Sequence, residues 1–130
     1  MSKALIHIVD DDPLFGKSIK KILQVNKYEN VVLFKNGEDC VQELHKKPKL
    51  VILDFSLETL NGLDVLRLIK KTNRNTKVVF LTSLDENKEL QERCEKEGAE
   101  GFFHKDQEGI EELITWMKKN ISSGFFSFFN

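Results

Sequence analysis

Short apolar runs alternate with helix-like patterns along the whole chain of 130 residues. The runs are rich in β-branched or aromatic residues, which is typical of buried strands. They predict strands in residues 4–9, 30–34, 50–53, 77–81 and 101–104. Between and after these runs, apolar residues recur three and four positions apart, and this spacing predicts amphipathic helices. The helical positions are Phe15, Ile19, Ile22 and Leu23; Val41 and Leu44; Leu63, Leu66 and Ile69; and Ile110, Leu113, Ile114, Met117 and Ile121.

Helix-capping residues support these assignments, because a side-chain oxygen just before a helix can accept a hydrogen bond from the first turn. The predicted caps are Asp12 followed by Pro13, Asn36, Ser83 with Glu86 three residues later, and Asp106.

The fourth helix, predicted in residues 86–97, is nearly all polar, and only Leu90 and Cys94 can face a core. We therefore expect it to be the most loosely held helix.

Strands that are each followed by a helix imply a mainly parallel sheet, because right-handed crossovers place helices on both faces. We therefore predict an α/β fold with a doubly wound, open, five-stranded parallel sheet; the chain is too short for an eight-fold barrel. We expect one domain in residues 1–121 and a tail in residues 122–130, which holds four of the ten phenylalanines. Exposed apolar patches usually mark contacts, so the tail is expected to contact its own domain or a neighbour.

Composition excludes some classes of partner. The net charge is −1, so nothing indicates direct binding to nucleic acid. No apolar run is long enough to span a membrane and no secretory signal pattern is present, so we expect a cytoplasmic location without membrane contact. Cys40 and Cys94 are expected to be buried or half-buried free thiols, and His7 and His104 to be packed or edge histidines within strands.

Polar residues with chemical potential directly follow four of the predicted strands. Asp10 and Asp11 follow the first strand, Asp54 the third, Thr82 the fourth and Lys105 the fifth. Ligands of open α/β sheets bind outside the carboxyl ends of the strands, so we expect these side chains to converge. Two like charges about 4 Å apart repel by about 4 kcal/mol at an effective dielectric constant of roughly 20, so a cation is expected to offset the carboxylates.

The converging groups suit Mg²⁺, which prefers carboxylates, water and phosphate oxygens. A carboxylate can also attack phosphorus and form an aspartyl phosphate when cations offset the charge of the phosphoryl oxygens. In this hypothesis Asp54 is the nucleophile, and Mg²⁺, Lys105 and Thr82 surround the phosphoryl group. Asp12 is more simply explained as the cap of the first helix.

Separately placed motifs now identify a family. The stretches IVDDDP, VILDFSLETLNGLDVL, VVFLTS and GAEGFFHKD strongly resemble the receiver domain of bacterial two-component response regulators. The likeness covers residues 4 to about 121. It implies a flavodoxin-like sheet with strand order 2-1-3-4-5.

The resemblance also assigns a phosphoacceptor and a metal site. Asp54 would accept a phosphoryl group from a phosphohistidine of a sensor histidine kinase or a phosphotransfer protein. Asp11 and Asp54 would ligate Mg²⁺ directly, together with the backbone carbonyl of Ser56, while Asp10 would act largely through water.

A switch is implied by the same resemblance. Lys105 would pair with Asp54 and then with the phosphoryl group. Thr82 would bind a phosphoryl oxygen, and the aromatic ring of Phe102 would turn inward behind it. The receiver would thereby control a downstream protein or an output domain, and it would be no enzyme beyond its self-catalysed phosphotransfer and slow autodephosphorylation.

The sequence departs from the family at three positions. Asp106 stands where receivers often have proline, so the Lys105–Asp106 bond is expected to be trans. Glu58 replaces a frequent proline in the loop after the phosphoacceptor, and Asn61 replaces a frequent aspartate. These departures concern the shape of the loops rather than the chemistry.

Two other functions stay open. One is an Mg²⁺-dependent aspartate phosphohydrolase, because Asp10-x-Asp12 superficially resembles the motif of haloacid-dehalogenase-type phosphatases, although Leu14 stands where that motif has Thr or Val. The other is a receiver-like interaction module that is not phosphorylated, and the complete set of acidic, hydroxyl and lysine residues argues against it.

Overall fold

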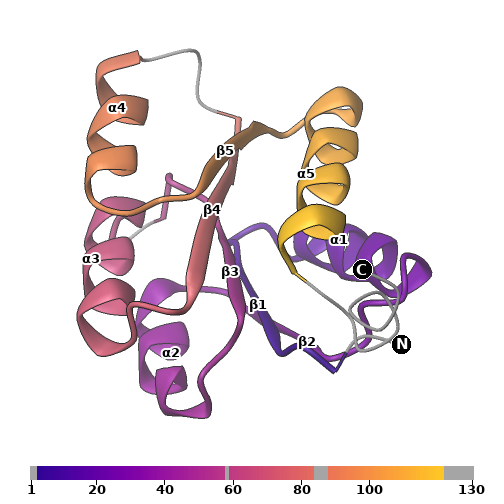
Figure 1. The fold of residues 1–130 in the computed structure, drawn as a ribbon, viewed down its shortest axis with the longest axis horizontal. Helices are drawn as coiled ribbons and strands as arrows, with labels where there is room; N and C mark the ends of the chain where they lie inside the picture. The colour runs from indigo at the N-terminus through magenta and orange to yellow at the C-terminus, as the bar shows by residue number, and fades with distance from the viewer. Residues whose placement is uncertain (1–2, 58, 84–87, 122–130) are drawn as a thin grey trace.

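A computed structural model of the chain describes residues 3–57, 59–83 and 88–121. Within them, parallel strands form one sheet in the order β2-β1-β3-β4-β5 (Figure 1), which confirms the predicted topology. The strands are β1 (Ile6–Val9), β2 (Val31–Phe34), β3 (Leu50–Leu53), β4 (Lys77–Thr82) and β5 (Gly101–His104). The helices are α1 (Pro13–Val25), α2 (Gly37–Gln42), η1 (Leu44–Lys46, a 3₁₀ turn), α3 (Gly62–Thr72), α4 (Lys88–Lys96) and α5 (Gln107–Asn120).

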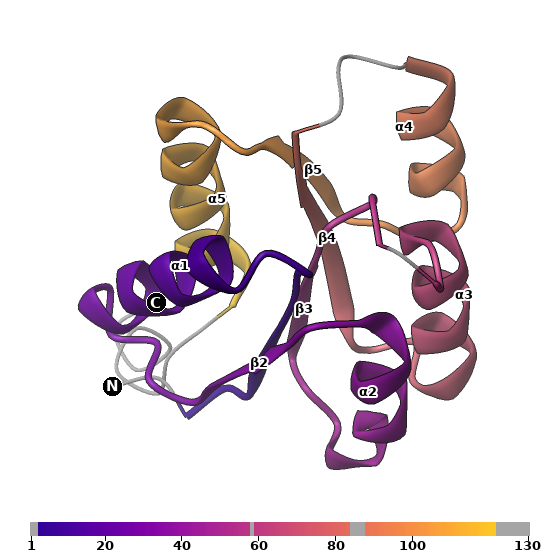
Figure 2. The same cartoon turned by 180° about the vertical axis from the view of Figure 1, so that it is seen from behind.

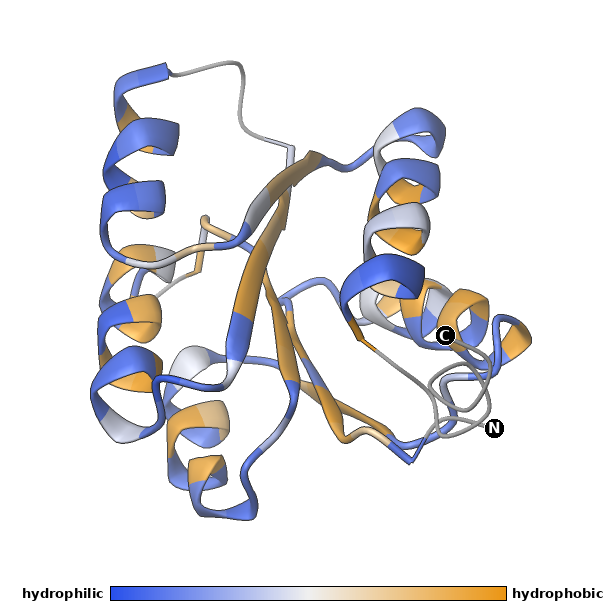
Figure 3. Ribbon diagram, in the orientation of Figure 1, coloured by the Kyte–Doolittle hydropathy of each residue, from blue (hydrophilic) through white to orange (hydrophobic). Residues whose placement is uncertain are grey.

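Helices cover both faces of the sheet. Figures 1 and 2 show α1 and α5 on one side, with α2, α3 and α4 on the other. Successive residues of a strand point to opposite faces, and in β3 Ile52 packs into the core beneath α1 and α5, whereas Leu53 packs into the core beneath α2, α3 and α4. The strands are therefore mostly hydrophobic, while the helices combine polar and apolar residues, with α4 the most polar (Figure 3).

The capping predictions hold wherever the structure describes them. Asp12 accepts hydrogen bonds from the N–H groups of the first turn of α1, Asn36 caps α2, and Asp106 caps α5. Asn61 also caps α3, through a 3.0 Å hydrogen bond from the Asp64 N–H, a role that was not predicted. The predicted box of Ser83 with Glu86 extends outside the described residues.

Element boundaries differ slightly from the predictions. β1 begins at Ile6 instead of residue 4, because its pairing with β2 begins only at the Ile6–Val31 pair. The last strand residue of β4 is Thr82, because its pairing with His104 extends the ladder by one residue. Cys94 is the one buried residue among the described residues of α4, which agrees with the prediction that this helix has few apolar residues to face the core. None of the helices in the described part of the chain is both long and apolar enough to cross a membrane.

Both predicted free thiols are buried, and one of them contacts a buried histidine. The His7 side chain in β1 is 1% exposed, its Nδ1 atom lies 3.9 Å from Sγ of Cys40, and the edge of its ring packs against Phe34. Burial lowers the pKa of His7 from 6.5 to about 4, because desolvation disfavours the charged ring. The nearby Glu43 carboxylate favours the charged ring, but its effect is smaller. His7 is therefore neutral at physiological pH, as expected for a packed histidine.

The His7 pKa predicts acid sensitivity of the fold. The unfolded chain protonates His7 below pH 6.5, whereas the folded chain does so only near pH 4, so its contribution to stability is complete above pH 6.5 and is lost towards pH 4. The loss amounts to about 3 kcal/mol. Urea unfolding at several pH values should show it, with a smaller pH dependence in His7→Val than in the exposed-histidine control His45→Gln. An equal pH dependence in both variants would contradict the prediction.

Candidate functional site

The predicted site residues meet at the carboxyl edge of the sheet because the strands are in register. Val9 pairs with Leu53, and the N–H of Asp54 donates to the carbonyl of Val9 over 3.0 Å, which places Asp54 beside the end of β1. At the other side of the sheet, the N–H of Lys105 donates to the carbonyl of Thr82 over 3.0 Å. Residues from four strand ends therefore lie at one edge.

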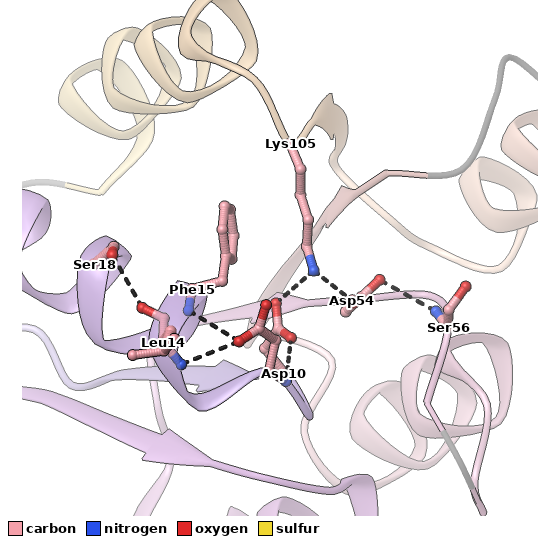
Figure 4. A network of polar contacts seen from close by, with 8 residues as sticks. Asp10, Leu14, Phe15, Ser18, Asp54, Ser56 and Lys105 are labelled. Carbon is pink, nitrogen blue, oxygen red and sulfur yellow. Dashed lines mark hydrogen bonds and ion pairs between the residues drawn. The ribbon is translucent and has the colours of Figure 1, made fainter.

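Lys105 links two of the carboxylates. Its Nζ atom lies 2.8 Å from Oδ2 of Asp54 and 2.8 Å from Oδ2 of Asp10 (Figure 4). The same ammonium group lies 4.6 Å from the centre of the Phe15 ring, a distance suited to a cation–π contact. The pairing with Asp54 was expected from the resemblance. The contacts with Asp10 and Phe15 were missed, since no sequence pattern signals them.

Burial and ion pairing both change the pKa values of Asp10 and Lys105. Asp10 is 3% exposed and Asp54 is 5% exposed. Desolvation raises the pKa of Asp10, and the hydrogen bonds from Lys105 and from the Asp12 N–H only partly oppose it. Desolvation also lowers the pKa of Lys105, but the hydrogen bonds to Asp10 and Asp54 outweigh this effect and leave it raised. Lys105 is therefore an ammonium group at neutral pH.

The carboxylates are close enough to share a cation. One oxygen each of Asp10, Asp11 and Asp54 lies within 4.8 Å of the others, with Asp11 exposed and the other two buried. Three carboxylates against one ammonium group leave an excess of negative charge, and carboxylate oxygens are the donors that Mg²⁺ prefers. The donor set thus fits the predicted metal.

Ser56 lies beside this donor set. Its backbone N–H donates to Oδ1 of Asp54 over 3.2 Å, which holds the carboxylate from the side opposite Lys105 (Figure 4). The loop then returns to α3, where the Gly62 N–H donates to the Phe55 carbonyl over 3.0 Å. A Cβ atom at Gly62 would lie 2.8 Å from Cα of Phe55, so the close return of the loop requires glycine. Glu58, in the same loop, lies outside the described residues.

The two predicted switch residues occupy different environments. Thr82 is fully buried at the end of β4. Phe102 in β5 is half-buried, and the centre of its ring lies 5.6 Å from that of Phe80 in β4. Phe80 in turn lies 5.9 Å from Phe55, in the loop after Asp54. Three rings therefore connect β5 with the loop of the candidate nucleophile.

The Lys105–Asp106 bond is trans, as expected from the absence of proline at position 106. Asp106 is the cap of α5, and its Oδ1 atom accepts a 2.6 Å hydrogen bond from the Gly109 N–H. The departure from the family pattern thus fixes the start of α5 directly after the lysine.

Residues 6–118 match the family model for the response regulator receiver domain. A putative transcriptional regulator of Pseudomonas aeruginosa is 33% identical over 129 residues, which cover 98% of this chain and 60% of the relative. The DNA-binding transcriptional activator EvgA of Escherichia coli K12 is 30% identical over 109 residues, which cover 83% of this chain and 52% of the relative. The matched region thus spans only about half to three fifths of these curated relatives.

Solved structures show the same fold. The BeF3-activated DrrB receiver domain is similar with a TM-score of 0.82 and 29% identity, and the match covers 93% of this chain and 98% of that one. The signal receiver domain of a putative Luxo repressor protein from Vibrio parahaemolyticus gives a TM-score of 0.82 and 25% identity, covering 91% of this chain and 89% of that one.

Proposed function

Because the chain belongs to the response regulator receiver domain family, we propose that it accepts a phosphoryl group on Asp54 in two-component signal transduction. The donor is a phosphohistidine of a sensor histidine kinase or a phosphotransfer protein. The observation that carries the proposal is the setting of Asp54, a buried carboxylate at the carboxyl edge of the sheet with Lys105 2.8 Å away and two further carboxylates beside it.

The transfer step needs a nucleophile and a means to balance charge. A carboxylate oxygen of Asp54 attacks phosphorus and forms the new O–P bond, while the P–N bond of the donor breaks and its electron pair returns to the imidazole. Lys105 already contacts the nucleophile, so its ammonium group is placed to accompany the charge as it moves to the phosphoryl oxygens.

The same carboxylates would hold Mg²⁺. Asp11 and Asp54 would bind it with the Ser56 carbonyl, and Asp10 would act largely through water. When bound, the ion would neutralise charge on the phosphoryl oxygens. The separation of the three carboxylates, with oxygens within 4.8 Å, supports this assignment.

Mapping the adduct tests the proposed function. We expect incubation with acetyl phosphate and Mg²⁺, followed by borohydride trapping and peptide mass spectrometry, to locate the phosphoryl group on Asp54. EDTA should suppress the reaction. An adduct on Asp10 with rapid turnover of small phosphate esters would establish the phosphohydrolase alternative. No adduct with any donor or cognate kinase would favour the interaction module that is not phosphorylated.

Asp11→Ala tests the metal assignment separately. Asp11 is the exposed member of the carboxylate cluster, so its removal leaves both ion pairs of Lys105 in place. We expect the variant to lose the Mg²⁺ dependence together with most of the rate, measured as adduct formed per minute at several Mg²⁺ concentrations. Asp39→Ala, at an exposed position on α2, is a matched control. A wild-type response to Mg²⁺ in Asp11→Ala would exclude this residue as a ligand.

We propose that the switch acts through Thr82 and Phe102 on α4, β5 and α5. Of the α4 residues, all of which the structure describes, Cys94 is the one that is buried, so few apolar contacts hold this helix against the sheet. Elements with few buried contacts open most easily. Beryllofluoride, a mimic of the phosphoryl group, should therefore change amide hydrogen exchange most in residues 88–120. Equal changes in α1 and α4 would contradict the assignment.

The boundaries and the cellular setting complete the proposal. We propose a receiver unit in residues 1–121 that acts in the cytoplasm on a downstream protein or output domain, and without direct nucleic-acid contact of its own. The relatives described as transcriptional regulators support an output domain as the partner. The proposed Phe-rich tail in residues 122–130, with its apolar contact, lies outside the described residues.

A further inference from the structure

A cavity lined by lysines lies at the amino edge of the sheet, opposite the acidic site. Its volume is about 510 Å³, and its polar lining comes from Lys3, Lys47, Lys49, Lys77, Asn75 and Asn120. No acidic residue is among the described residues that line it. In Figure 1 this edge lies at the lower end of the sheet, where α5 ends.

The strand register brings these lysines together. The N–H of Lys49 donates to the carbonyl of Leu5 over 2.8 Å, and the N–H of Lys77 donates to the carbonyl of Lys49 over 3.0 Å. The entries to β1, β3 and β4 thus lie side by side, at the spacing of about 4.8 Å that separates neighbouring strands. Segments far apart in the sequence therefore contribute lysines to the lining of one cavity.

The positive charges of this edge have no carboxylate partners among the residues that the structure describes. Within the described residues, none of these four lysines forms a salt bridge, whereas Lys46, Lys70 and Lys105 each pair with a carboxylate. The carbonyl ends of helices such as α5 carry about half a negative charge each, which offsets only part of the positive charge. The whole chain has a net charge of −1, so the concentration of positive charge here is local.

We propose that this cavity binds a small anion with two or more linked phosphate groups. Lysine ammonium groups bind phosphate as point charges, and the side-chain amide of Asn75 adds hydrogen-bond donors. Asn120 already donates one side-chain N–H to the Trp116 carbonyl over 2.8 Å, which leaves it one N–H for an anion. The volume lies within the range of about 300–1,000 Å³ that is usual for small-molecule sites. Leu5, half-buried in the cavity wall, offers apolar surface to a nucleoside. A nucleoside triphosphate and an inorganic polyphosphate share the chemistry that the lysines recognise.

Calorimetric titration of the full chain with tripolyphosphate and with ATP tests the proposal. The titrations contain EDTA, so that the carboxylates at the opposite edge hold no metal. We expect binding that weakens as NaCl is added, because salt screens exposed charges. The double variant Lys49→Gln/Lys77→Gln should lower the affinity about tenfold. The matched control Lys17→Gln/Lys21→Gln, with exposed lysines on α1, should keep the wild-type affinity.

The comparison of ATP with tripolyphosphate distinguishes a nucleotide site from a site for inorganic polyphosphate. Tighter binding of ATP than of tripolyphosphate supports a nucleotide that uses the apolar wall, and equal binding supports the polyphosphate group alone. Binding of neither ligand, or equal losses in the two double variants, would overturn the proposal. So would duplex DNA that binds more tightly than ATP and is weakened by the same variant, because the edge would then be a nucleic-acid surface. Adduct formation on Asp54 should not change in Lys49→Gln/Lys77→Gln, so this test is independent of the proposed function.

Discussion

Asp54→Asn is expected to abolish the phosphoryl adduct while the chain stays folded. The substitution keeps the shape of the side chain and an oxygen that can accept from the Ser56 N–H, but it removes the carboxylate that we propose as the nucleophile. Lys105 keeps its 2.8 Å contact with Asp10, so no buried ammonium group is left without a partner. We expect adduct formation to fall by at least about a hundredfold, since the other groups serve only to hold charge.

The matched control for this experiment is Asp64→Asn, on the exposed surface of α3, which should react like the wild type. Borohydride trapping measures the adduct, and circular dichroism checks the fold. An adduct that survives in Asp54→Asn but disappears in Asp10→Asn would move the nucleophile to β1. That result would favour the phosphohydrolase alternative over the receiver chemistry.

Gly109→Ala is expected to destabilise the fold strongly. A Cβ atom at this position would overlap the carbonyl oxygen of His104 and lie 2.8 Å from its backbone N and C atoms. These are backbone atoms of β5 and cannot rotate away, so the turn between β5 and α5 must open. We expect a loss of about 3 kcal/mol in the free energy of unfolding, at the upper end of the cost of overpacking.

Lys105 lies within the turn that Gly109→Ala would open, so phosphorylation should weaken together with stability. Urea unfolding measures the first effect and adduct formation the second. Thr115→Ala, at an exposed position of the same helix, should change the free energy of unfolding by less than about 0.5 kcal/mol. A wild-type unfolding midpoint in Gly109→Ala would show that the turn adjusts without cost.

The two variants separate chemistry from architecture. Asp54→Asn removes the proposed nucleophile from an intact edge of the sheet, whereas Gly109→Ala shifts the segment that carries Lys105. If the proposed function holds, only the second variant lowers stability and reactivity together. This contrast matters because Lys105 reaches the site from the edge strand β5, whereas Asp10 follows β1, which lies between β2 and β3.

The sequence by itself determined the architecture and the set of residues at the carboxyl edge. Alternating apolar runs and helical patterns predict β1 to β5 and their helices, because burial requires the period of each element to match its packing face. A parallel sheet places all carboxyl strand ends at one edge, so Asp10, Asp54 and Lys105 could be placed there without coordinates. The caps Asp12 and Asp106 were predicted for a similar reason, since capping is a local interaction within a few residues.

Only the tertiary structure decided which of these groups touch. Lys105 bridges Asp10 and Asp54 with its ammonium group over the ring of Phe15, and the lysines at the amino edge line one cavity. Such contacts join segments that are tens of residues apart and depend on strand register and side-chain conformation. Strand register and side-chain conformation leave no periodic signal in the sequence, because many sequences with the same apolar pattern would place these side chains differently.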